Sequence, residues 1–334
     1  MLDHHTRFAV IGHGSWATAI VKILTDNRRA VDWYVRNGEV LEHIAIQRSN
    51  PKYLSEVRFH TRRLTLHNNI DKAVENAQVV ILATPSAFIK DVLADLSYPL
   101  KDKFVISAIK GIVPDEYITI AEYLNQYWDM SFDNIGVLTG PCHAEEVALE
   151  KLSYLTVACK STQRAEEIAK SIANDYIRVS CSTDIYGTEY GAVLKNIYAI
   201  AVGICHSLGF GDNFTAVIIA NAAIEMERFM NNTYEFERQI LASAYLGDLL
   251  VTCYSGFSRN RTFGQLLGKG YSVKVAQIEM NMVAEGYYAT GCIQALKERN
   301  NMNIDMPIAD ALYRIIYKKK NARVEFQNIL SKFI

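Results

Sequence analysis

The sequence lacks the features of several broad classes of protein. Its six cysteines form no C-x-x-C pair and show no repeated spacing, so they indicate neither a metal site nor a disulfide framework and fit a reducing compartment. Its apolar runs are far shorter than the roughly 18 residues needed to cross a bilayer. The N-terminus has no cationic start followed by an apolar segment. We therefore expect a cytoplasmic protein without a bound metal, a secretory signal or a membrane span.

An excess of either charge is also missing. The 35 basic residues nearly cancel the 36 acidic ones, which gives a formal net charge of −1. Such a balance creates no long-range field that would attract nucleic acid or an anionic membrane surface. Binding of a small anion must therefore depend on a local arrangement of donors, and nucleic acid is not an expected partner.

Proline is scarce, and its distribution divides the chain. Residues 51, 85, 99, 114 and 141 are proline, and the next is Pro307. Long helices become possible where proline is absent, and we predict helices that include residues 188–208, 213–230 and 273–283. In the first half, β-branched runs alternate with helical stretches, which is typical of a parallel α/β sheet. The predicted strands are residues 7–12, 30–35, 77–84, 104–109, 134–140 and 154–159.

The composition and pattern thus predict two domains. A Rossmann-type α/β parallel-sheet domain is expected at residues 1–185, and an all-α domain at residues 186–334. The boundary falls in the segment STDIYG, without a flexible linker.

A glycine turn follows the first predicted strand. Gly12, Gly14 and Ala17 form a G-x-G-x-x-A pattern between a strand and a helix. Gly12 permits the tight turn, and Gly14 lets the backbone approach a pyrophosphate at the helix N-terminus. The pattern favours a dinucleotide site, the alternative being a strand-to-helix turn that binds nothing.

Arg36 lies near the end of the second predicted strand, where an NAD-selective site usually has an acidic residue. A guanidinium there could accept the 2′-phosphate of NADPH or stack on adenine. NADPH and NADH both remain open, and a solvated arginine is the alternative.

Lys195 is the one lysine in an otherwise apolar helical stretch, residues 188–208. Burial lowers the pKa of an amine, so a lysine held there could exchange protons with a substrate near neutral pH. Asp248 lies in a second apolar stretch and needs a partner, for which Lys195 is a candidate.

Three further segments have the character of an anion and carbonyl site. Lys110 follows a predicted strand at the carboxyl edge of the sheet, where such folds bind ligands. The segment VLTGPCHAEE places a Gly-Pro turn after another strand; a nucleophilic Cys142 beside His143 is disfavoured because neighbouring residues rarely point at each other. The segment SRNR precedes a predicted helix that ends in Gly268, and its donors could hold a phosphate.

The ordered motifs GHGSWATAI, AIKG, GPCHAEE, YGAVLKN, LGDLLVTC, FSRNR and AEGY resemble those of NAD(P)-dependent glycerol-3-phosphate dehydrogenases of the bacterial soluble type, over nearly the whole chain. The resemblance implies reduction of dihydroxyacetone phosphate to sn-glycerol 3-phosphate by NADPH or NADH, in a cleft between two domains. It also implies a homodimer and a supply of product to glycerophospholipid synthesis. Lys195 would be the general acid/base.

The resemblance further implies roles for the matching positions. The residues of the substrate site would be Lys110, Gly140, Cys142, Lys195, Asn196, Asp248, Ser258, Arg259 and Asn260. The residues that contact the cofactor would be Gly12, Gly14, Ser15, Trp16, Arg36, Lys110, Ala144, Arg259, Val283 and Glu285.

Some positions depart from the usual family pattern. His13 stands where a small residue is common, and Ala17 replaces a glycine. Cys142 and His143 replace a hydroxyl residue and a phenylalanine, which weakens any role for a hydroxyl at that position.

Two other functions compete with this interpretation. A β-hydroxyacid dehydrogenase also joins a Rossmann domain to helices, but its motif is K-x-x-x-N, whereas Ala199 lies four residues after Lys195 here. A non-catalytic dinucleotide sensor would leave Lys195, Asp248 and the arginine loop unexplained.

Overall fold

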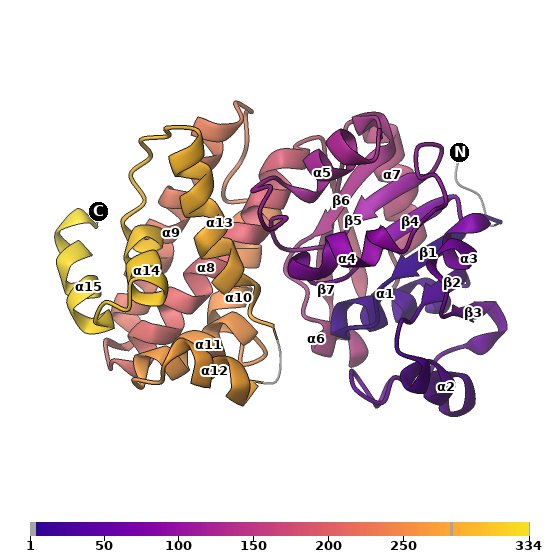
Figure 1. Ribbon diagram of the computed structural model, residues 1–334, viewed down its shortest axis with the longest axis horizontal. Coiled ribbons are helices and arrows are strands. Elements are labelled where there is room, and N and C mark those ends of the chain that lie inside the picture. The colour runs from indigo at the N-terminus through magenta and orange to yellow at the C-terminus, as the bar shows by residue number, and fades with distance from the viewer. Residues whose placement is uncertain (1–4, 281–282, 334) are drawn as a thin grey trace. The chain divides into compact units, whose positions relative to one another are not determined.

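The structure is a computed structural model that describes residues 5–280 and 283–333. The chain divides into two compact units (Figure 1). The first contains residues 1–109 and 120–185, and the second contains residues 110–119 and 186–334. The short segment 110–119, which the sequence analysis assigned to the first domain, therefore belongs with the helical unit.

The first unit is built on an eight-stranded sheet with the strand order β3-β2-β1-β4-β5-β6-β7-β8. Each of the six predicted strands is confirmed, because each predicted range contains or overlaps an observed strand. The two strands that were not predicted, β3 and β8, are the edges of the sheet and are only partly buried. The strands are β1 (Arg7–Ile11), β2 (Ala30–Tyr34), β3 (Leu64–His67), β4 (Val79–Leu82), β5 (Phe104–Ser107), β6 (Ile135–Thr139), β7 (Ser153–Cys159) and β8 (Ile177–Ser182).

The sheet is parallel except at one pair. Strands β6 and β7 run antiparallel, whereas the other neighbours, β7 and β8 included, are parallel. The connection between β6 and β7, residues 140–152, contains a five-residue helix. The prediction of a Rossmann-type sheet is confirmed, with this one reversal.

Helices flank the sheet and complete the first unit. They are α1 (Ser15–Asp26), α2 (Gly38–Gln47), α3 (Ile70–Glu75), α4 (Ile89–Ala94), α5 (Ile120–Tyr127), α6 (Ala144–Ala148) and α7 (Thr162–Ile172). Three 3-10 turns are η1 (Thr61–Arg63), η2 (Ser86–Phe88) and η3 (Phe132–Asn134). The strand residues of β1, β4 and β5 are almost completely buried, so the carboxyl ends of these strands are held firmly for any site built on them.

The second unit is helical. Its elements are α8 (Ile185–Ser207), α9 (Gly211–Thr233), the π-helical turn η4 (Ser243–Gly247), α10 (Asp248–Tyr254), α11 (Arg259–Gly268), α12 (Val273–Met280), α13 (Glu285–Arg299), α14 (Pro307–Tyr317), α15 (Ala322–Ile329) and the 3-10 turn η5 (Leu330–Lys332). The predicted helices at 188–208 and 213–230 are confirmed as α8 and α9. Of the predicted helix at 273–283, residues 273–280 form α12, and residues 281–282 lie outside the described residues.

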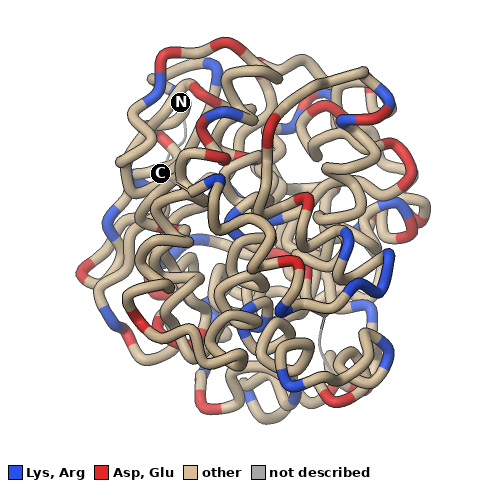
Figure 2. Tube along the Cα trace, turned by 90° about the vertical axis from the view of Figure 1, so that its left-hand side faces the viewer, with Lys and Arg blue, Asp and Glu red and all other residues tan. Residues whose placement is uncertain are grey.

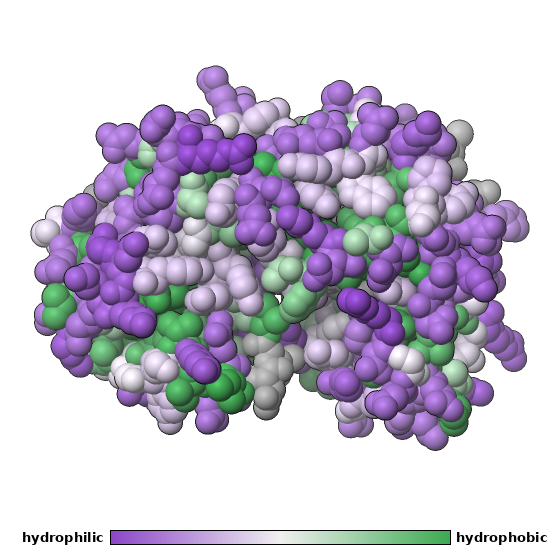
Figure 3. Space-filling model, viewed as in Figure 1, coloured by the Kyte–Doolittle hydropathy of each residue, from purple (hydrophilic) through white to green (hydrophobic). Residues whose placement is uncertain are grey.

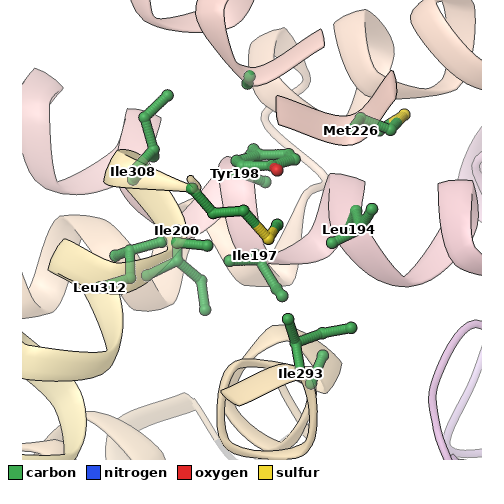
Figure 4. Packing of buried hydrophobic residues seen from close by; sticks show 14 of the residues in the cluster. Leu194, Ile197, Tyr198, Ile200, Met226, Ile293, Ile308 and Leu312 are labelled. Atoms are coloured by element: carbon green, nitrogen blue, oxygen red, sulfur yellow. The ribbon is translucent and has the colours of Figure 1, made fainter. Parts of the chain in front are cut away.

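Helix α8 is the centre of the helical unit. Leu194, Ile197, Tyr198 and Ile200 are fully buried on it and pack among side chains of α9, α13 and α14 (Figure 4). Proline is absent from its 23 residues, as an uninterrupted helix requires. Within the described part of the chain, no helix is both long and apolar enough to span a membrane.

The surface agrees with the balanced composition. Lys and Arg alternate with Asp and Glu along the trace (Figure 2). The face drawn in Figure 3 is mostly hydrophilic, with smaller apolar areas between the polar side chains.

Candidate active site

The glycine turn after β1 has the geometry that a dinucleotide site needs. Gly12 has a φ of +120°, and a Cβ at this position would lie 2.5 Å from the carbonyl oxygen of Ala83. The indole Nε1 of Trp33 donates to the carbonyl oxygen of Gly12 at 2.7 Å, which fixes the turn from the neighbouring strand. Only glycine fits at position 12.

Helix α1 begins immediately after this turn. Gly14 is its N-cap residue and provides no side-chain cap, and no acidic residue occupies the first turn. The first backbone N–H groups of a helix attract an anion, and the absence of a carboxylate leaves that attraction intact. Ser15 is buried, Trp16 is half-buried and Arg36 is exposed beyond the end of β2. These residues fit the pyrophosphate and adenosine end of a dinucleotide.

The Gly-Pro segment follows β6. Gly140 has a φ of +123°, and a Cβ on it would lie 2.7 Å from the carbonyl oxygen of Tyr154. Cys142 is buried, and Ala144 is the first residue of α6. Strands β4 and β5 separate β1 from β6 in the sheet. The two loops therefore lie at the carboxyl ends of different strands of one sheet.

The helical unit contains a buried ion pair. The ammonium Nζ of Lys195 on α8 lies 2.5 Å from Oδ1 of Asp248, the first residue of α10. Their side chains are 4% and 1% exposed. The sequence analysis named Lys195 as a candidate partner of Asp248, and the contact is confirmed. Asp248 directly follows the π-helical turn η4, a type of distortion that is frequent at functional sites.

The surroundings of Lys195 lower the pKa of its ammonium group. The pKa of Lys195 is lowered to about 7, because burial together with the nearby ammonium of Lys110 outweighs the opposing effect of Asp248. Burial is the largest of these effects because it penalises the charged form of an amine. An amine of this kind can donate or accept a proton near neutral pH.

A chain of hydrogen bonds joins four segments around this pair. Nδ2 of Asn196 donates to the carbonyl oxygen of Lys110 at 2.9 Å, and Nδ2 of Asn260 donates to Oδ1 of Asn196 at 2.9 Å. The backbone N of Gly286 donates to Oδ1 of Asn260 at 2.9 Å. The two amide side chains are thus largely occupied within the protein, and they hold Lys110 next to Lys195.

Residues 258–260 lie at the start of α11, as predicted. Ser258 is the N-cap residue, and its hydroxyl accepts a hydrogen bond from the backbone N of Arg261 at 3.3 Å. Arg259 is the first helical residue and half-buried, and Asn260 is buried. The helix N-terminus and a guanidinium together favour an anion there.

The other predicted residues of this unit lie at the start of α13. Glu285 is its first residue, and Val283 precedes it by two positions; both are half-buried. Hydrogen bonds and ionic contacts bring together Lys110, Lys195, Asn196, Asp248 and Asn260.

Two residues of this site were missed by sequence reasoning. The hydroxyl of buried Thr252 donates to the carbonyl oxygen of Asp248 at 2.6 Å, one turn along α10. Gly286 approaches the backbone of Asn196 so closely that a Cβ would overlap it. Thr252 could have been found because it lies four residues after Asp248 in an apolar stretch. Gly286 could have been found because it belongs to the motif AEGY.

Within the described residues, no cluster of His, Cys, Asp or Glu could hold a metal ion.

Known proteins resemble this chain along nearly its full length. The profile of the NAD-dependent glycerol-3-phosphate dehydrogenase N-terminus matches residues 7–165, and that of the C-terminus of the same family matches residues 184–327. The glycerol-3-phosphate dehydrogenase (NAD(P)+) of Macrococcus caseolyticus is 34% identical over 327 residues, and that of Clostridium botulinum is 32% identical over 326; each match covers 97% of both chains. A crystal structure of glycerol-3-phosphate dehydrogenase from Coxiella burnetii is 25% identical with a TM-score of 0.90, covering 98% of this chain and 99% of that one.

Proposed function

Because this chain belongs to the NAD-dependent glycerol-3-phosphate dehydrogenase family, we propose that it catalyses the reversible reduction of dihydroxyacetone phosphate to sn-glycerol 3-phosphate with NADPH or NADH. The observation that carries the proposal is the buried Lys195–Asp248 pair with Lys110 beside it. Reduction of a keto group needs a proton for the developing alkoxide, and Lys195 has a pKa suited to supplying it.

In this proposal the sheet unit, residues 1–109 and 120–185, supplies the dinucleotide-binding turn, and the helical unit, residues 110–119 and 186–334, supplies the catalytic residues. When bound, the reduced nicotinamide supplies the hydride. The turn at Gly12 and Gly14 binds the pyrophosphate, and the fit is supported by the space that Gly12 leaves and by the uncapped N-terminus of α1. The remaining contacts with the cofactor are assigned to Ser15, Trp16, Arg36, Lys110, Ala144, Arg259, Val283 and Glu285.

Lys195 acts as the general acid in reduction and as the general base in oxidation. Asp248 keeps its ammonium oriented in a buried site, where electrostatic interactions are strong. Lys110 adds a second positive charge toward the developing alkoxide. Asn196 and Asn260 contribute by fixing the backbone at Lys110 as well as by lining the substrate site.

The phosphate of the substrate binds at the start of α11. Ser258, Arg259 and the first backbone amides of this helix supply donors, and Arg259 adds charge. Binding energy from the phosphate orients the distant carbonyl group. Gly140 and Cys142 line the substrate site as well; the role of Cys142 does not require a hydroxyl.

Arg36 permits the binding of NADPH as well as NADH, because a guanidinium can bind the 2′-phosphate that only NADPH has.

The family resemblance is the basis for the assembly and the cellular setting that we propose. We place the enzyme in the cytoplasm as a homodimer, where its product enters glycerophospholipid synthesis.

The direct test follows the absorbance of the reduced nicotinamide with dihydroxyacetone phosphate, with NADPH and NADH assayed separately. Oxidation that depends on the triose phosphate is expected, and the two rates show what Arg36 does. A protein that binds NADPH and oxidises it with neither this substrate nor 3-oxo acids would contradict the dehydrogenase function.

Replacement of Lys195 by alanine tests the role of the amine. Turnover is expected to fall by roughly 10²- to 10⁴-fold, the contribution typical of a general acid. Cofactor affinity, measured by titration calorimetry, is expected to remain nearly unchanged. Turnover equal to that of the unmodified enzyme would remove Lys195 from the chemistry.

A further inference from the structure

His13 places a titratable group within the glycine turn itself. It lies between Gly12 and Gly14, where β1 ends and α1 begins. Its ring is half-buried. A small residue at this position would leave only backbone donors at the turn, so the imidazole adds a side chain that can carry a charge.

The backbone of His13 is fixed by the loop that follows α2. Nδ2 of Asn50 donates both to the carbonyl oxygen of His13 and to Oγ1 of Thr18, each at 2.9 Å. Asn50 is fully buried. Because Asn50 bonds to both the turn and the first helix, the backbone at His13 is held in place before any ligand binds.

The same loop brings a cation near the ring. Oδ1 of Asn50 accepts a hydrogen bond from the backbone N of Lys52 at 3.1 Å, and Lys52 is exposed. Burial, and then the charge of Lys52, lower the pKa of His13 below its ordinary 6.5. Asn50 and Thr18 are neutral, and the first turn of α1 contains no acidic residue. The ring is therefore mostly uncharged in the free protein near neutral pH.

A bound pyrophosphate would favour the charged form of His13, which burial and Lys52 disfavour in the free protein. Gly12 and Gly14 are the positions that let the pyrophosphate approach the backbone, so the residue between them is the one whose side chain is near enough in the chain to reach its negative charges. A nearby anion favours the protonated form of histidine. An imidazolium would then donate a charge-assisted hydrogen bond to a phosphate oxygen.

We propose that His13 takes up a proton from solvent when the dinucleotide binds and contacts the pyrophosphate as a cation. This inference rests on dinucleotide binding by the first unit. It makes cofactor affinity pH-dependent: the affinity falls as the pH rises above the pKa of His13 in the free protein. The limit is about tenfold per pH unit for one proton.

Titration calorimetry in two buffers that differ in ionisation enthalpy measures this proton directly. NADPH and NADH are each titrated at about pH 7, without substrate. Uptake of up to one proton is expected, equal for both cofactors because both contain the pyrophosphate. Uptake with NADPH alone would overturn the assignment, because it would point to the 2′-phosphate.

Variants identify the group that takes up the proton. The uptake is expected to vanish in His13→Ala and His13→Asn, with weaker binding of both cofactors. It is expected to persist in the control His60→Ala, which removes an exposed histidine of the same unit, and in Lys195→Met, which removes a buried amine with a pKa of about 7. Binding with no uptake, or uptake retained in both His13 variants, would overturn the inference. Absence of any binding heat with either cofactor would instead contradict the proposed function.

Discussion

Lys195 depends on a single carboxylate for its charge. Burial favours the neutral amine, and Asp248 is the acidic group that opposes this effect. The pair was predictable from the sequence because each residue is the charged exception in an apolar stretch. The hydrogen-bonded chain through Asn196 and Asn260 was not, because its members come from segments far apart in sequence, and hydrogen-bond partners depend on tertiary packing.

Replacement of Asp248 by asparagine is expected to lower kcat/KM for reduction by roughly 10²- to 10⁴-fold, because the proton donor is lost. Without the carboxylate the pKa of Lys195 falls further, so the amine is neutral at a lower pH than before. The activity that remains is therefore expected to decline at lower pH than in the unmodified enzyme. A pH profile of kcat/KM measures both effects.

The matched control for this variant is Asp310→Asn. Asp310 pairs with Lys297 at 2.7 Å in the same unit, and no site residue is involved. This change is expected to leave the pH profile unaltered. Equal losses in the two variants, or an unchanged profile in Asp248→Asn, would contradict the role given to Asp248.

At the scale of elements, the sequence was most informative where elements are buried or long. The interior strands and the helices α8 and α9 have continuous apolar patterns, and the length of each pattern distinguishes a strand from a helix. The edge strands β3 and β8 were missed because one side of each lacks a neighbour, and their residues are less buried and less uniformly apolar than those of the interior strands. The reversal at β7 was missed because strand direction depends on the connection rather than on the strand residues.

Close packing of α8 against α11 depends on glycine at two positions. A Cβ on Gly264 would overlap the carbonyl oxygen of Ile200, and a Cβ on Gly203 would overlap that of Arg261. Gly264→Ala is therefore expected to force the helices apart and to destabilise the protein by about 1–3 kcal/mol. Thermal unfolding measures the change.

Gly38→Ala is the control for this prediction, because a Cβ on Gly38 would meet nothing within 4 Å. Its stability is expected to remain the same or to rise slightly, since alanine is the better helix former. A melting temperature of Gly264→Ala that matches that of Gly38→Ala would show that the two helices can separate at no cost.

At the scale of the whole molecule, the order of a sheet domain and a helical domain followed from the strand alternation and the later scarcity of proline. The segment 110–119 could not be assigned correctly from the same pattern, because it directly follows a predicted strand yet makes its contacts with the helical unit. The hydrogen bond from Asn196 to the carbonyl oxygen of Lys110 is one of these contacts. The order of segments in the chain thus predicts the unit to which most residues belong. For segment 110–119 the unit depends on contacts with residues far away in sequence.

The stability of the molecule is expected to depend on pH through Glu225. This residue is 2% exposed, and its carboxylate accepts hydrogen bonds from the backbone N of Ile308 at 2.6 Å and of Ala309 at 3.2 Å, at the start of α14. Burial raises the pKa of Glu225 from 4.5 to about 8, although these hydrogen bonds oppose the shift.

Because the pKa of Glu225 is higher in the folded than in the unfolded chain, its contribution to stability is complete below 4.5 and is lost as the pH rises toward about 8. Lys195 has the opposite shift, but its contribution changes only above about 7. Melting temperatures measured between about pH 5 and 7 therefore exclude Lys195. His13, whose pKa is lowered by folding, contributes the opposite trend in this interval, so the effect of Glu225 is read from the difference between variants. Glu225→Gln keeps a neutral oxygen at α14 and is expected to flatten the decline of the melting temperature over this interval, whereas exposed Glu235→Gln is expected to preserve it. An equal decline in all three proteins would show that Glu225 does not change its protonation on unfolding.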